Sequence, residues 1–312
     1  MSTPRVVCLG EALIDLIAAD ASGRQWRAMP GGAPYNAAIA AGRLGAPTSF
    51  LGVLSEDHFG RMLRSHLQSS HVDGGHCRTT AEPTTLALVA PGDDGAFTFH
   101  VAGTTTMSQV ANDLHLPPDL GVLHVSGSVA LVLEPVASRL EGLLAAAQHR
   151  ALIQIDANPR PMLIGRDRYL RRFGHWLGIA DIVKLSVDDV AWMSPGSDPV
   201  ASARLWVAPD VDDAHAPGVV ILTRGAEGAS IIRPDGVIEV EAPDVDVVDT
   251  VGAGDTFAGA TLAALAAHEV NSRAALDRLD LRWWNTAASY AAKAASIACT
   301  RAGADPPRRN DL

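Results

Sequence analysis

Runs of apolar residues that suit strands alternate along this chain with stretches that suit helices. Strands are predicted over 5–17, 48–53, 121–129, 151–155, 181–185 and 219–223, and helices over 33–45, 58–70, 135–149, 166–177, 187–193, 200–206 and 281–300. Two hairpins are also predicted, over 86–101 around the turn Pro91–Gly95 and over 230–240 around Pro234–Gly236. The alternation indicates an α/β fold in which helices cover a mainly parallel sheet.

Two early segments depart from this alternation. Residues 11–32 and 78–106 have patterns typical of half-exposed antiparallel strands, and we expect them to form a small second sheet, such as a lid. The first strand also carries two acids, Glu11 and Asp15. Because a core strand seldom holds two charges, at least one of them is expected to face a cleft. The alternative is a solvated charge on an edge strand.

Composition narrows the class of protein. With 312 residues, 47% hydrophobic content and a net charge of −10, the chain is expected to be globular and not to bind nucleic acid. Its three cysteines, Cys8, Cys77 and Cys299, have no metal or disulfide spacing, which favours a reducing cytoplasm. No signal peptide and no apolar run long enough to span a membrane are predicted.

A glycine-punctuated turn, Asp249–Phe257, leads directly into an apolar helix. A helix without a polar face is expected to be buried. Its first N–H groups and the positive end of its dipole favour an anion, and Gly252 and Gly254 leave the backbone there uncovered. A carboxylate, Asp255, lies at the same place. The turn therefore predicts a phosphate site with its own general base, and the alternative is that Asp255 caps the helix.

Several familiar sites are excluded. The chain has only two lysines, Lys184 and Lys293, and neither belongs to a Walker A loop. The late Gly252 and Gly254 lack the third glycine of a dinucleotide fingerprint, no nucleophile elbow is present, and His268-Glu269 lacks the second histidine of a zinc helix. Phosphate binding through backbone amides, with a carboxylate base and Mg²⁺, is what phosphoryl transfer requires.

Six motifs in one order carry a resemblance to a known family. Residues Asp249–Phe257 look like the C-terminal signature of the ribokinase-like (PfkB) carbohydrate kinases, and Gly31–Ala38 with Leu44-Gly45 look like the N-terminal one. The resemblance continues through Gly10-Glu11 with Asp15, residues 156–160, Thr223–Gly228, Asn285 and Gly303-Ala304. These motifs cover nearly the whole chain, and six of them in order are highly specific.

The resemblance implies one ribokinase-like domain over 1–312: a doubly wound, mainly parallel sheet flanked by helices, with the lid of 11–32 and 78–106 over a sugar. It implies ATP as phosphoryl donor, Mg²⁺ as its companion, and Asp255 as the base for a primary sugar hydroxyl. The anion hole would comprise Gly252 and the amides of Ala253, Gly254 and Asp255. Substrate contacts would come from Asp15, Gly31, Gly32, Asn36 and Arg160.

The resemblance further implies contacts to the nucleotide and to cations. Nucleotide contacts would come from Lys184, Ser186, Thr223, Gly225, Gly228 and Asn285, and a K⁺ site from Asp249, Val251, Ala298 and Gly303. Many relatives carry Asn-x-x-Glu where this chain has Ser186 and Asp189, so Asp189, or alternatively Asp188, would approach Mg²⁺ through water. As alternatives, Ser186 would be a helix cap and Asp249 a turn former.

The sugar is less well defined. Residues 121–131 with Glu134-Pro135, and 156–161, are similar to fructokinases. Val101 stands where many fructokinases and sugar-acid kinases have an arginine, which disfavours a carboxylate such as 2-keto-3-deoxygluconate. Fructose therefore leads, ahead of ribose, another neutral sugar or a nucleoside. A catalytically silent sugar- or nucleotide-binding regulator is the non-enzymatic alternative. Exposed lid edges also predict a homodimer formed lid to lid.

Overall fold

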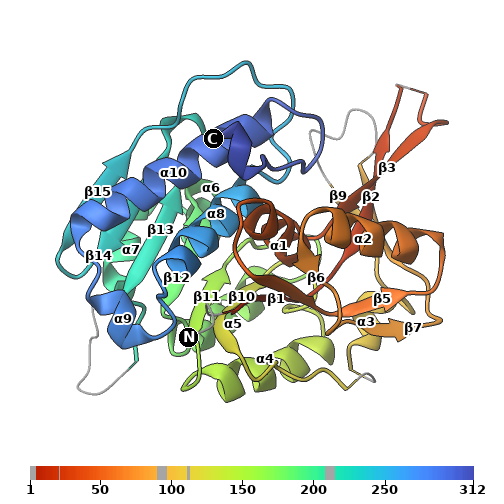
Figure 1. Ribbon diagram of the computed structural model, residues 1–312, viewed down its shortest axis with the longest axis horizontal. Helices are drawn as coiled ribbons and strands as arrows, with labels where there is room; N and C mark the ends of the chain where they lie inside the picture. The colour runs from red at the N-terminus through yellow and green to blue at the C-terminus, as the bar shows by residue number, and fades with distance from the viewer. Residues whose placement is uncertain (1–4, 21, 90–96, 111–112, 208–214) are drawn as a thin grey trace.

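A nine-stranded sheet forms the centre of the protein (Figure 1). The computed structural model describes residues 5–20, 22–89, 97–110, 113–207 and 215–312. In spatial order the strands are β15 (Gly236–Val240), β14 (Ala229–Arg233), β13 (Val219–Thr223), β12 (Ile182–Ser186), β11 (Leu152–Asp156), β10 (Leu120–Ser126), β1 (Arg5–Leu9), β4 (Thr48–Leu51) and β6 (Val72–Asp73). The strands from β13 to β6 are parallel, and the predicted hairpin β14–β15 forms an antiparallel edge.

Helices cover both faces of this sheet because alternate strand residues point to opposite sides. Val6 and Cys8 belong to one apolar cluster, and Val7 and Leu9 to the other. The first cluster includes residues of α1 (Ala33–Arg43), α2 (His58–Ser69), α8 (Ala253–Ala267), α9 (Arg273–Asp277) and α10 (Leu281–Cys299). The second includes residues of α4 (Val136–Ala147), α5 (Arg166–Leu177), α6 (Val187–Met193) and α7 (Pro199–Val207). The predicted doubly wound α/β fold is confirmed.

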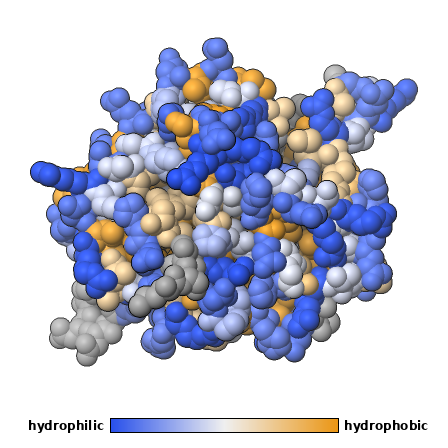
Figure 2. All heavy atoms as spheres, in the orientation of Figure 1, coloured by the Kyte–Doolittle hydropathy of each residue, from blue (hydrophilic) through white to orange (hydrophobic). Residues whose placement is uncertain are grey.

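A second, four-stranded sheet projects from one end of the main sheet (Figure 1). Its order is β3 (Trp26–Gly31), β2 (Leu13–Ala18), β8 (Thr85–Val89) and β9 (Phe97–His100). The lid was expected to be antiparallel, but its central pair β2–β8 is parallel. Its outer end is hydrophilic in the space-filling view (Figure 2). The edge strands are β3 and β9, and edge-to-edge pairing of two lids stays a prediction.

The single strand predicted over 5–17 is in fact two strands in different sheets. Gly10 separates β1 from β2 with φ +150, a conformation that other residues rarely adopt. A methyl group at Gly10 would also lie 2.7 Å from Cγ of Pro34. The break leaves Glu11 between the two sheets, and Asp15 lies within the lid strand β2.

Other parts of the second predicted segment lie outside the lid. Strand β7 (Arg78–Thr80) pairs with β5 (Val53–Ser55), and α3 (Thr105–Ser108) is a short helix. The predicted turn Pro91–Gly95 lies outside the described residues. Among the described helices, none is long and apolar enough to cross a membrane.

Helices α1 and α8 pack unusually closely. Gly259 of α8 faces α1, where an added methyl group would lie 2.5 Å from the carbonyl oxygen of Ala37 and from Cβ of Ala40. Only glycine permits this approach of two helix backbones. Both helices begin at glycine turns, and their first turns meet where Asn36 contacts Asp255, at the carboxyl edge of the main sheet. Ligands of open α/β sheets characteristically bind at this edge.

Candidate active site

Asp255 lies in the first turn of α8, immediately after the predicted glycine turn. Gly252 precedes the helix in the left-handed conformation, with φ 77, and a methyl group there would lie 2.6 Å from Cβ of Ala304. Both facts require glycine at this position. The Asp255 carboxylate accepts a hydrogen bond from the side-chain amide of Asn36, Nδ2 to Oδ2, at 2.8 Å. Asn36 therefore orients the carboxylate from the first turn of α1.

A small cavity of about 150 Å³ lies on the lid side of Asp255. Its polar lining comprises Glu11, Asp15, Asn36, Ser128, Arg160 and Asp255, and its apolar lining includes Leu13, Phe97, Phe99 and Val129. Gly32 also lines it. Gly31 lies directly beside Asp15, since a methyl group at Gly31 would lie 2.1 Å from Oδ2 of Asp15. The predicted sugar residues are thus gathered around one small, polar cavity.

A larger cavity of about 840 Å³ lies on the other side of Asp255. Its lining includes Asp156, Lys184, Ser186, Asp188, Asp189, Thr223, Gly225, Gly228, the segment 242–245, Ala253, Gly254, Ala292, Ser296 and Cys299. Arg160, Gly252 and Asp255 line both cavities. The two cavities therefore meet at Asp255, where the N-terminus of α8 points toward them.

A buried ion pair lies beneath this junction. Asp156 and Lys184 are in register on β11 and β12, and Nζ of Lys184 donates to Oδ2 of Asp156 at 2.9 Å. Burial alone would lower the pKa of Lys184, but the Asp156 carboxylate more than reverses this and raises it. A methyl group at Gly254 would lie 3.3 Å from Nζ of Lys184, so the ammonium group lies against the first turn of α8. The ammonium group of Lys184 thus lies next to the helix N-terminus, and the Asp156 carboxylate balances its charge.

Ser186 and Asp189 form a reciprocal cap at the start of α6. The N–H of Asp189 donates to Oγ of Ser186 at 3.0 Å, and the N–H of Ser186 donates to Oδ2 of Asp189 at 2.7 Å. The alternative interpretation of Ser186 as a helix cap thus describes its geometry. One oxygen of Asp189 is committed to this cap, although the residue still lines the larger cavity. The predicted water-mediated Mg²⁺ contact of Asp189 would have to use the other oxygen.

Asp249 joins the glycine turn before α8 to the chain that follows α10. Its carboxylate accepts hydrogen bonds from the N–H of Val251 at 3.0 Å and from the N–H of Gly303 at 2.8 Å. The N–H of Asp249 in turn donates to the carbonyl of Cys299. Asp249, Val251 and Gly303, three of the residues predicted to hold K⁺, are therefore in contact. The carbonyl oxygen of the fourth, Ala298, already accepts a hydrogen bond from the N–H of Arg301. Within the described residues no cluster of three acidic, histidine or cysteine side chains suggests a metal centre.

Some predicted nucleotide residues have other positions or tasks. Asn285 is exposed near the start of α10 and does not line the larger cavity; the later turns of α10 do so through Ala292 and Ser296. The helix rises by about 1.5 Å per residue, so seven residues separate Asn285 from the cavity by about 10 Å. Thr223 donates to the carbonyl of Leu185 at 3.3 Å while lining the cavity. Gly228, with φ 90, permits close approach of Val240.

The sequence interpretation gave no role to Glu11 in the smaller cavity. Glu11 is buried and accepts hydrogen bonds from Oγ of Ser128 at 2.5 Å and from the N–H of Ala130 at 3.1 Å. Phe97 and Phe99 reach the same cavity from the lid strand β9. The pair of acids in the first predicted strand was the signal for Glu11, since both acids line this cavity. Nothing local in the sequence signals Ser128.

Burial raises the pKa of two carboxylates that line the smaller cavity, those of Asp15 and Asp255. The pKa of Asp255 is raised to about 6, with the Asn36 hydrogen bond opposing the effect of burial. The pKa of Asp15 is raised to about 7 by burial and then by the Asp255 carboxylate, while Arg160 lowers it. The two carboxylates therefore share one electrostatic environment, and Arg160 is the cation that both face.

Asp15→Asn is expected to stabilise the protein at alkaline pH and to weaken sugar binding. The unfolded chain loses the Asp15 proton near pH 3.8, whereas the folded protein retains it to about pH 7. The stability contributed by this group is therefore full below pH 3.8 and lost as the pH rises to about 7. We expect a gain on the order of 1–3 kcal/mol at pH 8, shrinking toward pH 4, measured by urea unfolding. The exposed Asp244→Asn is the control. Equal stability of wild type and Asp15→Asn at pH 8 would contradict this account.

The fold is that of an α/β transferase, with two cavities that meet at one carboxylate. The chain belongs to the pfkB family of carbohydrate kinases, whose family model matches residues 3–310. It is accordingly an ATP-dependent sugar kinase.

Relatives and solved structures agree with this family. The chain is 36% identical over 268 residues to a fructokinase of Rhizobium leguminosarum bv. trifolii, covering 83% of this chain and 79% of the relative. It is 33% identical over 299 residues to a fructokinase of Klebsiella pneumoniae, covering 93% and 94%. A fructokinase of Xylella fastidiosa, solved with ATP, superimposes with a TM-score of 0.85 at 27% identity, covering 97% and 94%. An aminoimidazole riboside kinase of Salmonella enterica gives 0.77 at 28% identity, covering 96% and 95%.

Proposed function

We propose that the protein transfers the γ-phosphoryl group of ATP to a primary hydroxyl of fructose, with Asp255 as the general base. The observation that carries this proposal is the position of Asp255, on the wall shared by a small polar cavity and a larger cavity. A sugar in the first and a nucleotide in the second would bring the acceptor hydroxyl and the phosphate together at this carboxylate. Geometry of this kind accounts for much of the catalysis in phosphoryl transfer.

The reaction balances with the residues present. The hydroxyl oxygen forms a bond to the γ-phosphorus, the bond from that phosphorus to the ADP oxygen breaks, and the hydroxyl proton moves to Asp255. The amides of Ala253, Gly254 and Asp255, with Gly252 leaving the turn open, would stabilise the charge on the transferring group. Lys184 and Arg160 add positively charged groups to the wall of the larger cavity. Asn36 holds the carboxylate in its orientation.

The wall of the larger cavity offers ligands that suit a nucleotide-bound metal. Asp188 and Asp189 line it together with Lys184. Mg²⁺ prefers carboxylate and water oxygens and is usually held by one or two carboxylates plus phosphates. We therefore assign Asp188 and the free oxygen of Asp189 to Mg²⁺, which would supply neutralisation of the nucleotide charge. A K⁺ role for Asp249, Val251, Ala298 and Gly303 belongs to the same proposal, and one related fructokinase structure is described with fructose, ADP and potassium.

The charge of the smaller cavity favours a neutral sugar. Three carboxylates, from Glu11, Asp15 and Asp255, face one guanidinium, from Arg160. A sugar acid such as 2-keto-3-deoxygluconate would bring a further negative charge to this wall, which is unfavourable in a desolvated site. Carboxylates are good acceptors for several hydroxyl groups at once. A cavity of about 150 Å³ also favours a monosaccharide over a nucleoside.

A substrate panel tests the proposed specificity. With ATP and Mg²⁺, we expect ADP release to give its highest kcat/KM with fructose, a lower value with ribose, and a value at least about 100-fold lower with 2-keto-3-deoxygluconate, because of the unpaired carboxylate. Adenosine and aminoimidazole riboside complete the panel. Highest activity on a sugar acid or a nucleoside would overturn the fructose proposal. Sugar binding by calorimetry without turnover would favour a regulator.

A further inference from the structure

The chain that follows α10 packs against the glycine turn that precedes α8. Ala304 packs against Gly252, where a methyl group would lie 2.6 Å from its Cβ. The neighbouring Gly303 donates its N–H to Asp249 at 2.8 Å and lies against Met29 of the lid strand β3. Residues 301–306, here called the support loop, therefore contact the turn at one point and the lid strand next to Gly31 at another. A shift of this loop would be transmitted to the turn.

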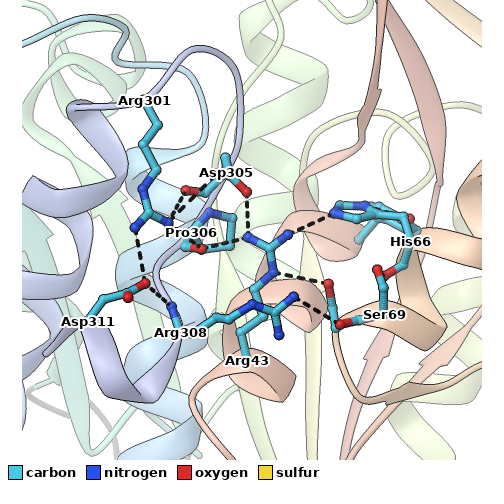
Figure 3. A network of polar contacts seen from close by, with 10 residues as sticks. Arg43, His66, Ser69, Arg301, Asp305, Pro306, Arg308 and Asp311 are labelled. Carbon is cyan, nitrogen blue, oxygen red and sulfur yellow. Dashed lines mark hydrogen bonds and ion pairs between the residues drawn. The ribbon is translucent and has the colours of Figure 1, made fainter.

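One buried arginine fixes the support loop to the helices. Nη1 of Arg43 donates to Oδ1 of Asp305 at 2.5 Å and to the carbonyl of Pro306 at 2.6 Å (Figure 3). The same guanidinium lies against α2, through Oγ of Ser70 at 3.0 Å and Nε2 of His66 at 3.2 Å. The Arg43 side chain is 9% exposed and that of Asp305 44%. A planar group with several fixed donors suits this task, and a lysine would satisfy only part of it.

The helix that carries Arg43 also carries Asn36. Arg43 is the last residue of α1, and Asn36, in its first turn, donates to Asp255. Between them α1 is locked against α8 by the close approach at Gly259. The helix thus holds the carboxylate at one end and the support loop at the other. Both contacts converge on the same turn.

We propose that Arg43 is a positioning residue for phosphoryl transfer: its clamp on Asp305 and Pro306 holds the support loop against Gly252 and so keeps the amides of Ala253, Gly254 and Asp255 in place. The inference rests on the proposed function of these amides. Arg43 lines neither cavity. Its loss therefore changes the orientation of the amide N–H groups of the anion hole and leaves the substrate contacts intact. Misplacement of catalytic groups by about 1 Å lowers rates by up to about 100-fold.

Steady-state kinetics of Arg43→Gln, with the best sugar of the panel, tests the proposal. We expect kcat to fall about 10- to 100-fold while KM for sugar and ATP changes less than about threefold. Affinity for ADP should be unchanged by calorimetry. Affinity for ADP with aluminium fluoride and sugar, which mimics the transferring phosphoryl group, should fall with kcat. The control is Arg308→Gln, which removes the donor to the Ser69 carbonyl at the edge of the same network and should retain wild-type kcat.

Two further variants keep the proposal falsifiable if Arg43→Gln folds poorly. Asp305→Asn removes the ion pair at a half-exposed carboxylate and should lower kcat by a smaller factor, and the double variant should be no slower than Arg43→Gln. Added guanidinium at millimolar concentration should restore part of the kcat of Arg43→Ala. Wild-type kcat in folded Arg43→Gln, or a loss confined to thermal stability, would overturn the proposal. Failure of the proposed function would appear differently, as a wild-type protein that turns over no sugar.

Discussion

Asp255→Asn should lower kcat by about 10²- to 10⁴-fold, the usual contribution of a positioned general base. The substitution keeps the shape of the side chain, and its amide oxygen can still accept the hydrogen bond from Asn36. The proton acceptor is lost, so the hydroxyl must attack without transferring its proton to the enzyme. Because the proposed sugar and ATP contacts come from other residues, KM values should change far less than kcat.

The pH dependence gives this prediction a second readout. Since burial raises the pKa of Asp255 to about 6, kcat/KM of the wild type should be constant near pH 8 and fall about tenfold per pH unit below about pH 6. The residual kcat/KM of Asp255→Asn should not show this decrease below pH 6. Asp167→Asn, which alters an exposed acid in the first turn of α5, serves as the matched control and should keep wild-type kinetics. A wild-type rate in Asp255→Asn would remove Asp255 from the mechanism.

Lys184→Met should destabilise the protein by about 3–5 kcal/mol, the usual cost of leaving a buried charge without its partner. Asp156 lies almost fully buried beside Lys184, with its other oxygen lacking any hydrogen-bond partner. The substitution leaves this carboxylate uncompensated in a low-dielectric environment. It also removes the ammonium group next to Gly254, so KM for ATP should rise in whatever protein remains folded.

Urea unfolding at pH 7 measures the expected loss of stability in Lys184→Met directly. The chain offers a matched control in its other lysine: Lys293 donates from an exposed position to the Leu312 carbonyl, so Lys293→Met should cost less than about 0.5 kcal/mol. The double variant Lys184→Met with Asp156→Leu should recover part of the lost stability, because both charges are then gone. Equal destabilisation by the two lysine substitutions would show that the buried pair contributes little.

The sequence predicted those parts of the protein whose pattern is local. The turn Asp249–Phe257 and the helix after it could be interpreted from residue types alone, because glycines, an apolar run and an acid follow one another directly. Helix boundaries such as those of α5 and α6 were predicted to the residue, since amphipathic spacing defines them. The parallel sheet followed from alternation over most of the chain.

Features set by long-range packing were beyond the sequence. The division of residues 5–17 into two strands depends on Gly10 meeting Pro34, and the parallel pair β2–β8 depends on how the lid meets the main sheet. Asn285 was assigned by motif order alone, but the direction of α10 brings its later turns to the cavity instead. The contact of Arg43 with Asp305 joins residues 262 positions apart, so no local sequence pattern could predict it.

The break at Gly10 places β1 in the main sheet and β2 in the lid, so the residues around the two cavities come from both sheets. The lid contributes Leu13, Asp15, Phe97 and Phe99 to the smaller cavity, whereas the turn before α8 and the larger cavity belong to the main sheet and its helices. Under the proposed function, the lid supplies one part of the acceptor wall, the elements around the main sheet supply the rest, and the two parts meet near the Asp255 carboxylate. Substitutions in the lid strands would therefore alter one wall of the smaller cavity without touching the turn that carries Asp255.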